Sequence, residues 1–307
     1  MIVRPRPPLW RLFFILKGSV ITRILPQLCV VFVLSLIVVA AHRTFPGRVP
    51  AFSNGAGLTL LGIALSIFLG FRNNACYDRW WEARKVWGRL VAVSRNFARQ
   101  TLILEGRPET AERRAELLRH VIAFSHAMVS HLRPAPGEPK LERWLSAEER
   151  AAFAASRNGP DLILRRLGAI LAALRAEGVL HPADFQTLDK SVTAMAEIQA
   201  ASERLRSTPV PFGYTLLLHR TAYLFCLSIP FGFAQLMGWG TPLLATLIAY
   251  TFFGLDALGD ELEDPFGELP NDLPIGALAD VIEINLREAM GETDLPLLPE
   301  PVDYLLM

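Results

Sequence analysis

The sequence predicts an all-α membrane protein with four membrane-spanning helices in two hairpins and a large helical cytosolic domain. The first observation is composition. Of 307 residues, 51% are hydrophobic and 20% are charged, and the mean hydropathy of +0.30 is too high for an ordinary soluble enzyme. The second is that apolar runs able to cross a bilayer occur in two pairs, separated by about 140 residues that contain none.

The N-terminal 23 residues contain five cations and no acid: Arg4, Arg6, Arg11, Lys17 and Arg23. Aromatic residues between these cations predict an amphipathic segment lying at the lipid headgroups. The apolar run 24–41 then predicts a first span, and Pro26 sits near its start, where a missing amide is tolerated. A cleaved signal peptide is the alternative, but the leader and the apolar run are both long for one.

The uncharged run 58–71 predicts the second span, and as a helix it carries two neighbouring stripes of four-residue spacing. The small stripe is Gly62, Ser66 and Gly70, and the bulky stripe is Ile63, Ile67 and Phe71. Small residues let helices approach closely in lipid, so copies of the chain touching there would point the bulky stripe at a shared axis as a hydrophobic pore neck. From periodicity alone, the favoured interpretation is a lipid-facing stripe beside a packing stripe.

Polar residues follow the bulky stripe immediately. Arg72, Asn73 and Asn74 are candidates for a hydrated pore mouth, and the alternative is ordinary interfacial polarity. Cations dominate both the leader and the segment after Phe71, so we expect both on the cytoplasmic side, joined by a hairpin.

Between the hairpins, apolar periodicity predicts helices over 120–132, 162–174 and 187–205, and Ser146 is a candidate N-cap for another. The second hairpin comprises 221–237 and 243–255 around an uncharged turn, which places both chain termini in the cytoplasm. An acidic segment, a helix over 275–290 and a proline-rich tail complete the chain. The predicted domains are 1–71, 72–213, 214–258 and 259–307.

Several functions lack support. The three cysteines are far apart, no histidine has a ligand partner at helical spacing, and no nucleophile elbow, P-loop or His-Glu-x-x-His motif occurs, so an enzyme is not expected. The net charge of +1 indicates no nucleic-acid partner. The acidic segment 259–274 is the strongest metal candidate, for calcium, although pairing with the cytoplasmic arginines is the favoured explanation.

Three motifs in the same order, FLGFRNNACYDRWWEAR, SERLRSTPVPFGYTL and ELEDPFG...NDLP, resemble the bestrophin family in its bacterial branch. The resemblance implies a homopentameric ion channel with a pore neck formed by the second span and a cytosolic vestibule that narrows to an aperture. Carried onto this sequence, the neck is Ile63, Ile67 and Phe71. Counting back from the second motif puts the aperture near His181 to Phe185, with Ala183 as the candidate residue.

Two departures from the family pattern matter. Animal bestrophins, which pass chloride and other anions, have phenylalanine at the position of Ile67, and isoleucine offers no positive ring edge to an anion. We therefore expect monovalent cations to permeate ahead of chloride. Of the aspartates in the animal calcium clasp, only Asp264 and Asp272 have counterparts here, so we expect no cofactor and weak or absent calcium gating.

The sequence thus predicts a passive channel in a bacterial cytoplasmic membrane, whose partners are lipid, inorganic ions and further copies of itself. A non-conducting membrane scaffold that binds a partner through its cytosolic helices would have the same hydropathy. A membrane enzyme that uses the acidic segment as a metal site is a third alternative.

Overall fold

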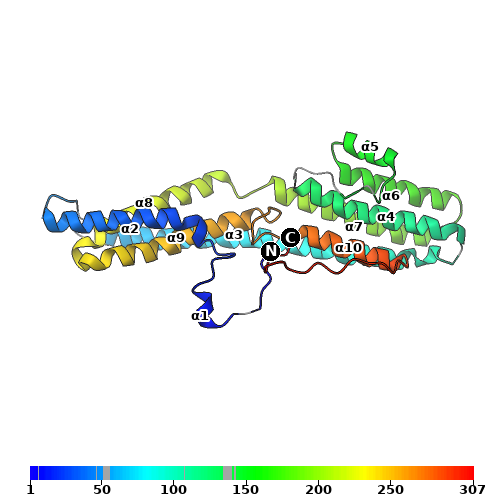
Figure 1. Ribbon diagram of the computed structural model, residues 1–307. Helices are drawn as coiled ribbons and strands as arrows, with labels where there is room; N and C mark the ends of the chain where they lie inside the picture. Colours follow the sequence, from blue (N-terminus) through cyan, green and yellow to red (C-terminus); the bar gives the residue numbers. More distant parts are fainter. Residues whose placement is uncertain (6, 46, 51–55, 107, 134–139, 142) are drawn as a thin grey trace. The chain divides into compact units, whose positions relative to one another are not determined.

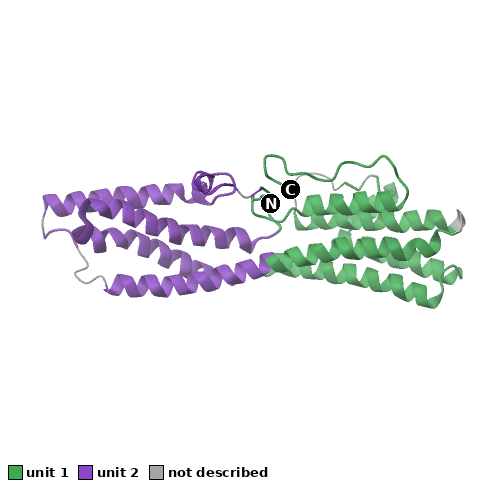
Figure 2. Cartoon of the chain, turned by 90° about the horizontal axis from the view of Figure 1, so that it is seen from below, with its two compact units in different colours: residues 1–4, 81–208, 266–307 green, residues 5–80, 209–265 purple. Residues whose placement is uncertain are grey.

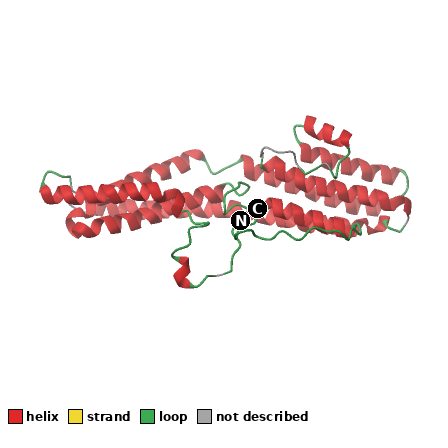
Figure 3. Ribbon diagram, viewed as in Figure 1, coloured by secondary structure: helices red, strands yellow, loops and turns green. Residues whose placement is uncertain are grey.

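The computed structural model describes residues 1–5, 7–45, 47–50, 56–106, 108–133, 140–141 and 143–307. Within these ranges the chain is helical, and strand-like pairing is limited to isolated bridges at the chain ends (Figure 3). The chain forms two compact units (Figure 2). Unit 1 comprises residues 1–4, 81–208 and 266–307, and unit 2 comprises residues 5–80 and 209–265.

Unit 2 is the apolar part of the chain. Its elements are α1 (Leu9–Leu12), α2 (Ile21–Thr44), the first part of α3 (Ala56–Gln100), α8 (Phe212–Met237), the 3-10 turn η2 (Gly238–Gly240) and α9 (Thr241–Glu263). Helices α2, α8 and α9 lie side by side (Figure 1). Their shared core includes an edge-to-face pair of Phe225 and Phe252 with ring centroids 4.9 Å apart.

Three described helical segments are long and apolar enough to cross a membrane, namely 21–44, 56–104 and 212–263. The last contains both α8 and α9, so all four predicted apolar runs are confirmed as helical. The structure extends the second run well past Phe71, because the polar residues that follow contain no proline and favour a helix. Of the predicted N-terminal amphipathic segment, the described residues before α2 are helical only in the four-residue α1.

Gly62 corrects the predicted role of the small stripe. A Cβ atom at this position would lie 2.9 Å from Cζ of Phe225 on α8, so the close approach that glycine permits occurs here inside one chain. A Cβ atom at Gly70 would meet nothing within 4 Å. Contact between copies therefore stays a prediction for Gly70 and Ser66.

Unit 1 contains the polar helices. They are the second part of α3, the 3-10 turn η1 (Thr101–Leu104), α4 (Pro108–Leu132), α5 (Ala147–Ala155), α6 (Gly159–Ala176), α7 (Pro182–Ser207) and α10 (Ile275–Ala289). Helix α4 packs against both α6 and α10, and α6 packs against α7 (Figure 1). The helices predicted for this region are confirmed, and most begin several residues earlier than the apolar pattern does.

Ser146 caps α5 as predicted. Its hydroxyl accepts a hydrogen bond from the Glu149 backbone N–H at 3.2 Å, and the Glu149 carboxylate accepts one from the Ser146 N–H at 3.0 Å. Burial alone would raise the pKa of Glu149, but the hydrogen bonds from the Ser146 N–H and from His120 lower it to about 2. The Glu149 carboxylate is therefore ionised at neutral pH.

The two chain ends meet in unit 1. Ile2 pairs with Leu305, and the Val3 N–H donates to the Tyr304 carbonyl at 2.8 Å. Residues 1–4 thus belong with the C-terminal tail, whereas the sequence assigned them to the first hairpin. The other unit boundaries fall at 80/81, 208/209 and 265/266. The predicted boundaries at 71/72 and 258/259 lie inside α3 and α9, because both helices continue into polar sequence.

Candidate functional site: an exposed apolar stripe and a buried charge cluster

The bulky stripe of α3 is exposed in the single chain. Ile63, Ile67 and Phe71 are 54%, 52% and 62% exposed, whereas Leu65 and Leu69 on the opposite face are 3% and 0% exposed in the core of unit 2. Residues four apart in a helix share one face, so the three exposed side chains form a continuous apolar surface. In a membrane helix such a surface contacts lipid or another copy, or lines a dry passage.

Directly after this stripe, Arg72 lies fully buried inside unit 2. Its Nη1 is 2.8 Å from Oδ1 of Asp256, and its Nη2 is 2.5 Å from Oδ1 of Asp260 and 3.4 Å from Oε2 of Glu263. Buried charges persist only when they are paired and hydrogen-bonded. The guanidinium therefore joins α3 to α9 through three carboxylates.

Two further side chains extend this charge cluster. Nδ1 of His219 on α8 lies 2.7 Å from Oδ2 of Asp256, and Nη2 of Arg23 on α2 lies 2.8 Å from Oδ2 of Asp260. The Glu263 carboxylate also accepts a hydrogen bond from the Val210 N–H at 3.1 Å. The cluster thus connects all four long helices of unit 2 behind the exposed stripe.

The predicted pore mouth begins at Arg72. In the single chain its guanidinium is buried and paired with carboxylates, so it holds helices together there, and a place at the pore mouth stays a prediction for it. Asn73 is half-buried, and its Oδ1 lies 2.6 Å from the position of a Cβ atom on Gly259. Asn74 is exposed, and a place at a pore mouth stays a prediction for it.

The carboxylate partners of Arg72 carry a signal that the sequence analysis missed. Asp256, Asp260 and Glu263 are spaced at i, i+4 and i+7, which puts all three on one helix face. Three acids on one face at the end of an apolar helix predict a cation on a neighbouring helix, because buried carboxylates need a partner of opposite charge. The sequence interpretation grouped them instead with the acidic residues that follow.

The remaining predicted residues belong to different elements and to both units. Asp264 is exposed at the end of α9 in unit 2, whereas Asp272 is buried in unit 1, where its Oδ2 accepts a hydrogen bond from the Leu269 N–H at 2.6 Å. Ala183 is exposed in the first turn of α7. The calcium ligands and the aperture stay predictions.

Comparison with known proteins shows extensive similarity. Residues 1–288 match the profile of the family described as Bacterial/Fungal Bestrophin protein. A Mesorhizobium japonicum protein named "Voltage-dependent anion channel-forming protein" is 47% identical over 306 residues, which cover 99% of this chain and 97% of that one. A protein of Escherichia coli K12 with the same descriptive name is 39% identical over 296 residues, which cover 96% of each chain.

A solved structure agrees with these relatives. The crystal structure of a bacterial bestrophin homolog from Klebsiella pneumoniae, determined by Zn-SAD phasing, superposes with a TM-score of 0.81 at 36% identity. The superposition covers 88% of this chain and 99% of that chain. The similarity therefore extends over both units.

Proposed function

This chain belongs to the bacterial and fungal bestrophin family, and we propose that several copies of it form a passive ion channel in a membrane. The observation that carries the proposal is the exposed stripe of Ile63, Ile67 and Phe71, opposite a fully packed helix face. Arranged around a common axis, these side chains form three apolar rings. Ions cross such a neck only when it wets, so conduction depends on the width and the polarity of the rings.

The proposed topology has four spans and both termini in the cytoplasm of a bacterium. Direct pairing of Ile2 with Leu305 supports chain ends on one side of the membrane, as an even number of crossings gives. The excess of cations in the leader and after Phe71 supports a cytoplasmic location for that side. The family resemblance implies five copies. Charged side chains around the cytosolic vestibule of such an assembly would contribute to ion selectivity.

The expected preference for cations has no support in the relatives, whose names describe anion channels. The aliphatic rings favour cations only by lacking the aromatic edges that suit anions. Reversal potentials determine the sign directly. A tenfold salt gradient across a planar bilayer gives about 59 mV for ideal selectivity, with opposite polarity for cations and anions.

The neck is tested by planar-bilayer recording of Ile67→Ala. Shorter side chains widen the ring, so we expect a larger single-channel current. Ile37→Ala is the matched control, because Ile37 is 59% exposed on α2 and lies outside the stripe. Equal currents from both variants and the wild type would contradict the neck assignment. Purified protein that carries no ion flux in liposomes would instead support the scaffold alternative.

A further inference from the structure

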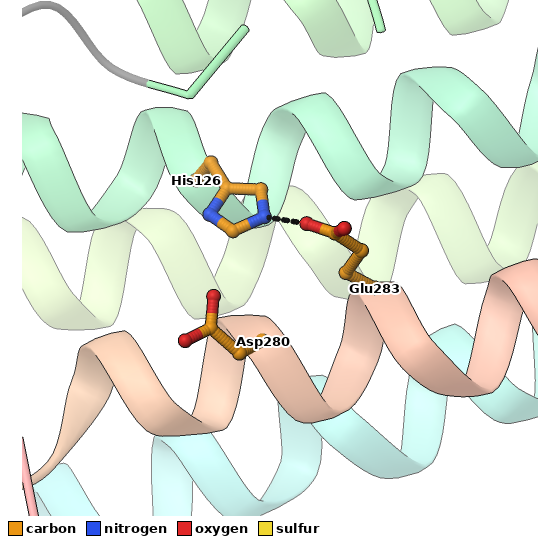
Figure 4. A group of neighbouring side chains, drawn as sticks. All are labelled: His126, Asp280 and Glu283. Carbon is orange, nitrogen blue, oxygen red and sulfur yellow. Dashed lines mark hydrogen bonds and ion pairs between the residues drawn. The ribbon is translucent and has the colours of Figure 1, made fainter. Parts of the chain in front are cut away.

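Three side chains with metal-ligand chemistry converge in unit 1, whereas the stripe and the charge cluster belong to unit 2. Asp280 and Glu283 are three residues apart on α10, which puts them on one face, and His126 projects toward them from α4 (Figure 4). Nε2 of His126 lies 2.7 Å from Oε2 of Glu283. One ligand atom from each of the three residues lies within 4.8 Å of the other two.

The surroundings are suited to a bound cation. His126 is more than nine-tenths buried and Glu283 is largely buried, while about a third of the Asp280 side chain reaches solvent. Burial of two ligands strengthens electrostatic attraction to an ion, and the exposed side leaves an entry path and room for a water ligand.

Two cations neighbour the group. Nζ of Lys140 is 3.2 Å from Oδ1 of Asp280, but most of the lysine side chain is in solvent and it can swing away. Nη1 of Arg287 is 3.6 Å from Oε1 of Glu283, while its Nε contacts Glu292 at 2.8 Å. Arg287 therefore contacts the Glu283 oxygen that His126 does not use, and it helps to orient the carboxylate.

We propose that His126, Asp280 and Glu283 bind a divalent transition-metal ion of the zinc type, with water as the fourth ligand. One imidazole nitrogen and two carboxylate oxygens match the ligands that Zn²⁺ accepts. Tetrahedral bonds of about 2.1 Å separate ligand atoms by roughly 3.4 Å. The His126–Glu283 contact must then open by less than 1 Å, and Asp280 must move inward.

A hydrogen-bonded pair that merely holds α4 to α10 would explain His126 and Glu283 without Asp280, which such an explanation leaves to its exposed ion pair with Lys140. The chain offers two comparisons: His120 pairs with Glu149 at 3.0 Å, and His131 pairs with Glu203 at 3.1 Å. Among the described residues, neither pair belongs to a group of three such ligands. Replacing Asp280 therefore distinguishes a metal site from a hydrogen-bonded pair that only joins α4 to α10.

The test is calorimetric titration of Zn²⁺ into the full-length protein in detergent, after EDTA treatment and its removal. We expect one saturable ion per chain for the wild type. Asp280→Asn should weaken the affinity at least about tenfold and leave the melting temperature in EDTA unchanged. His131→Gln is the matched control, because it removes a histidine of the same helix without touching the site.

Co²⁺ provides a second readout, because tetrahedral cobalt with protein ligands absorbs visible light. The wild type and His131→Gln should give these absorption bands, and Asp280→Asn should not. Absence of saturable binding to the wild type would overturn the proposal, and so would equal affinity of the wild type and Asp280→Asn. Both readouts measure ion binding, so they are independent of whether the protein conducts.

Discussion

Replacing Arg72 with methionine isolates the contribution of the buried charge cluster. Methionine fills a similar volume but leaves the three carboxylates without their shared cation. Asp260 keeps its contact with Arg23 at 2.8 Å. Asp256 stays buried, where its remaining contact among the described side chains is with Nδ1 of His219 at 2.7 Å.

The expected cost follows from this burial. Removing one partner of a buried ion pair costs about 3–5 kcal/mol of unfolding free energy, because an uncompensated charge stays in a medium of low polarity. The matched control is Arg23→Met. Arg23 is about half exposed and contacts a partly exposed Asp260, so solvent screening limits its loss to about 0–1 kcal/mol. For a chain of this length, 1 kcal/mol corresponds to about 2 °C in melting temperature.

Buried thiols supply the assay. Cys76 and Cys226 are buried, so a thiol-reactive fluorescent dye labels them only when unit 2 opens, and a background Cys29→Ser substitution removes the exposed cysteine. In detergent, Arg72→Met should melt about 6–10 °C below the wild type, and Arg23→Met within about 2 °C of it.

A compensating variant tests the electrostatic reason for that loss. Adding Asp256→Asn to Arg72→Met removes the stranded charge and should recover part of the lost stability. If Arg72→Met melts together with Arg23→Met, the guanidinium does not hold the bundle together and the reasoning fails.

Three further predictions concern other parts of the chain. Gly62→Ala should cost about 1–3 kcal/mol by crowding Phe225, and the added Phe225→Leu substitution should relieve that loss; equal melting of Gly62→Ala and wild type would contradict the packing argument. Glu149→Gln should lower the melting temperature at pH 7. Because the pKa is lower in the folded chain, this difference should shrink as the pH falls from about 4.5 toward about 2, and a constant difference across that range would refute the assignment. Calcium titrated during bilayer recording should leave the current nearly unchanged, and steep micromolar activation would refute the weak calcium site.

The sequence by itself determined which segments are helices and which of them are apolar enough for a membrane. These properties are local, because hydropathy and periodicity are read within 10–20 neighbouring residues. The same periodicity placed Ile63, Ile67 and Phe71 on one face, and the structure exposes that face. Helix ends were predicted less well, since α3 and α9 continue into polar sequence that the apolar pattern does not cover.

Only the tertiary structure decided which residues contact each helix face. Arg72 follows an apolar run and resembles an interfacial cation, yet its partner Asp256 lies 184 residues away in the chain. Gly62 looked suited to contact a second copy, but Phe225 of the same chain occupies the space beside it. His126 had no carboxylate at helical spacing, and α10 brings two close to it from more than 150 residues later. Such contacts depend on how helices pack, and packing selects partners by shape and charge across the whole chain.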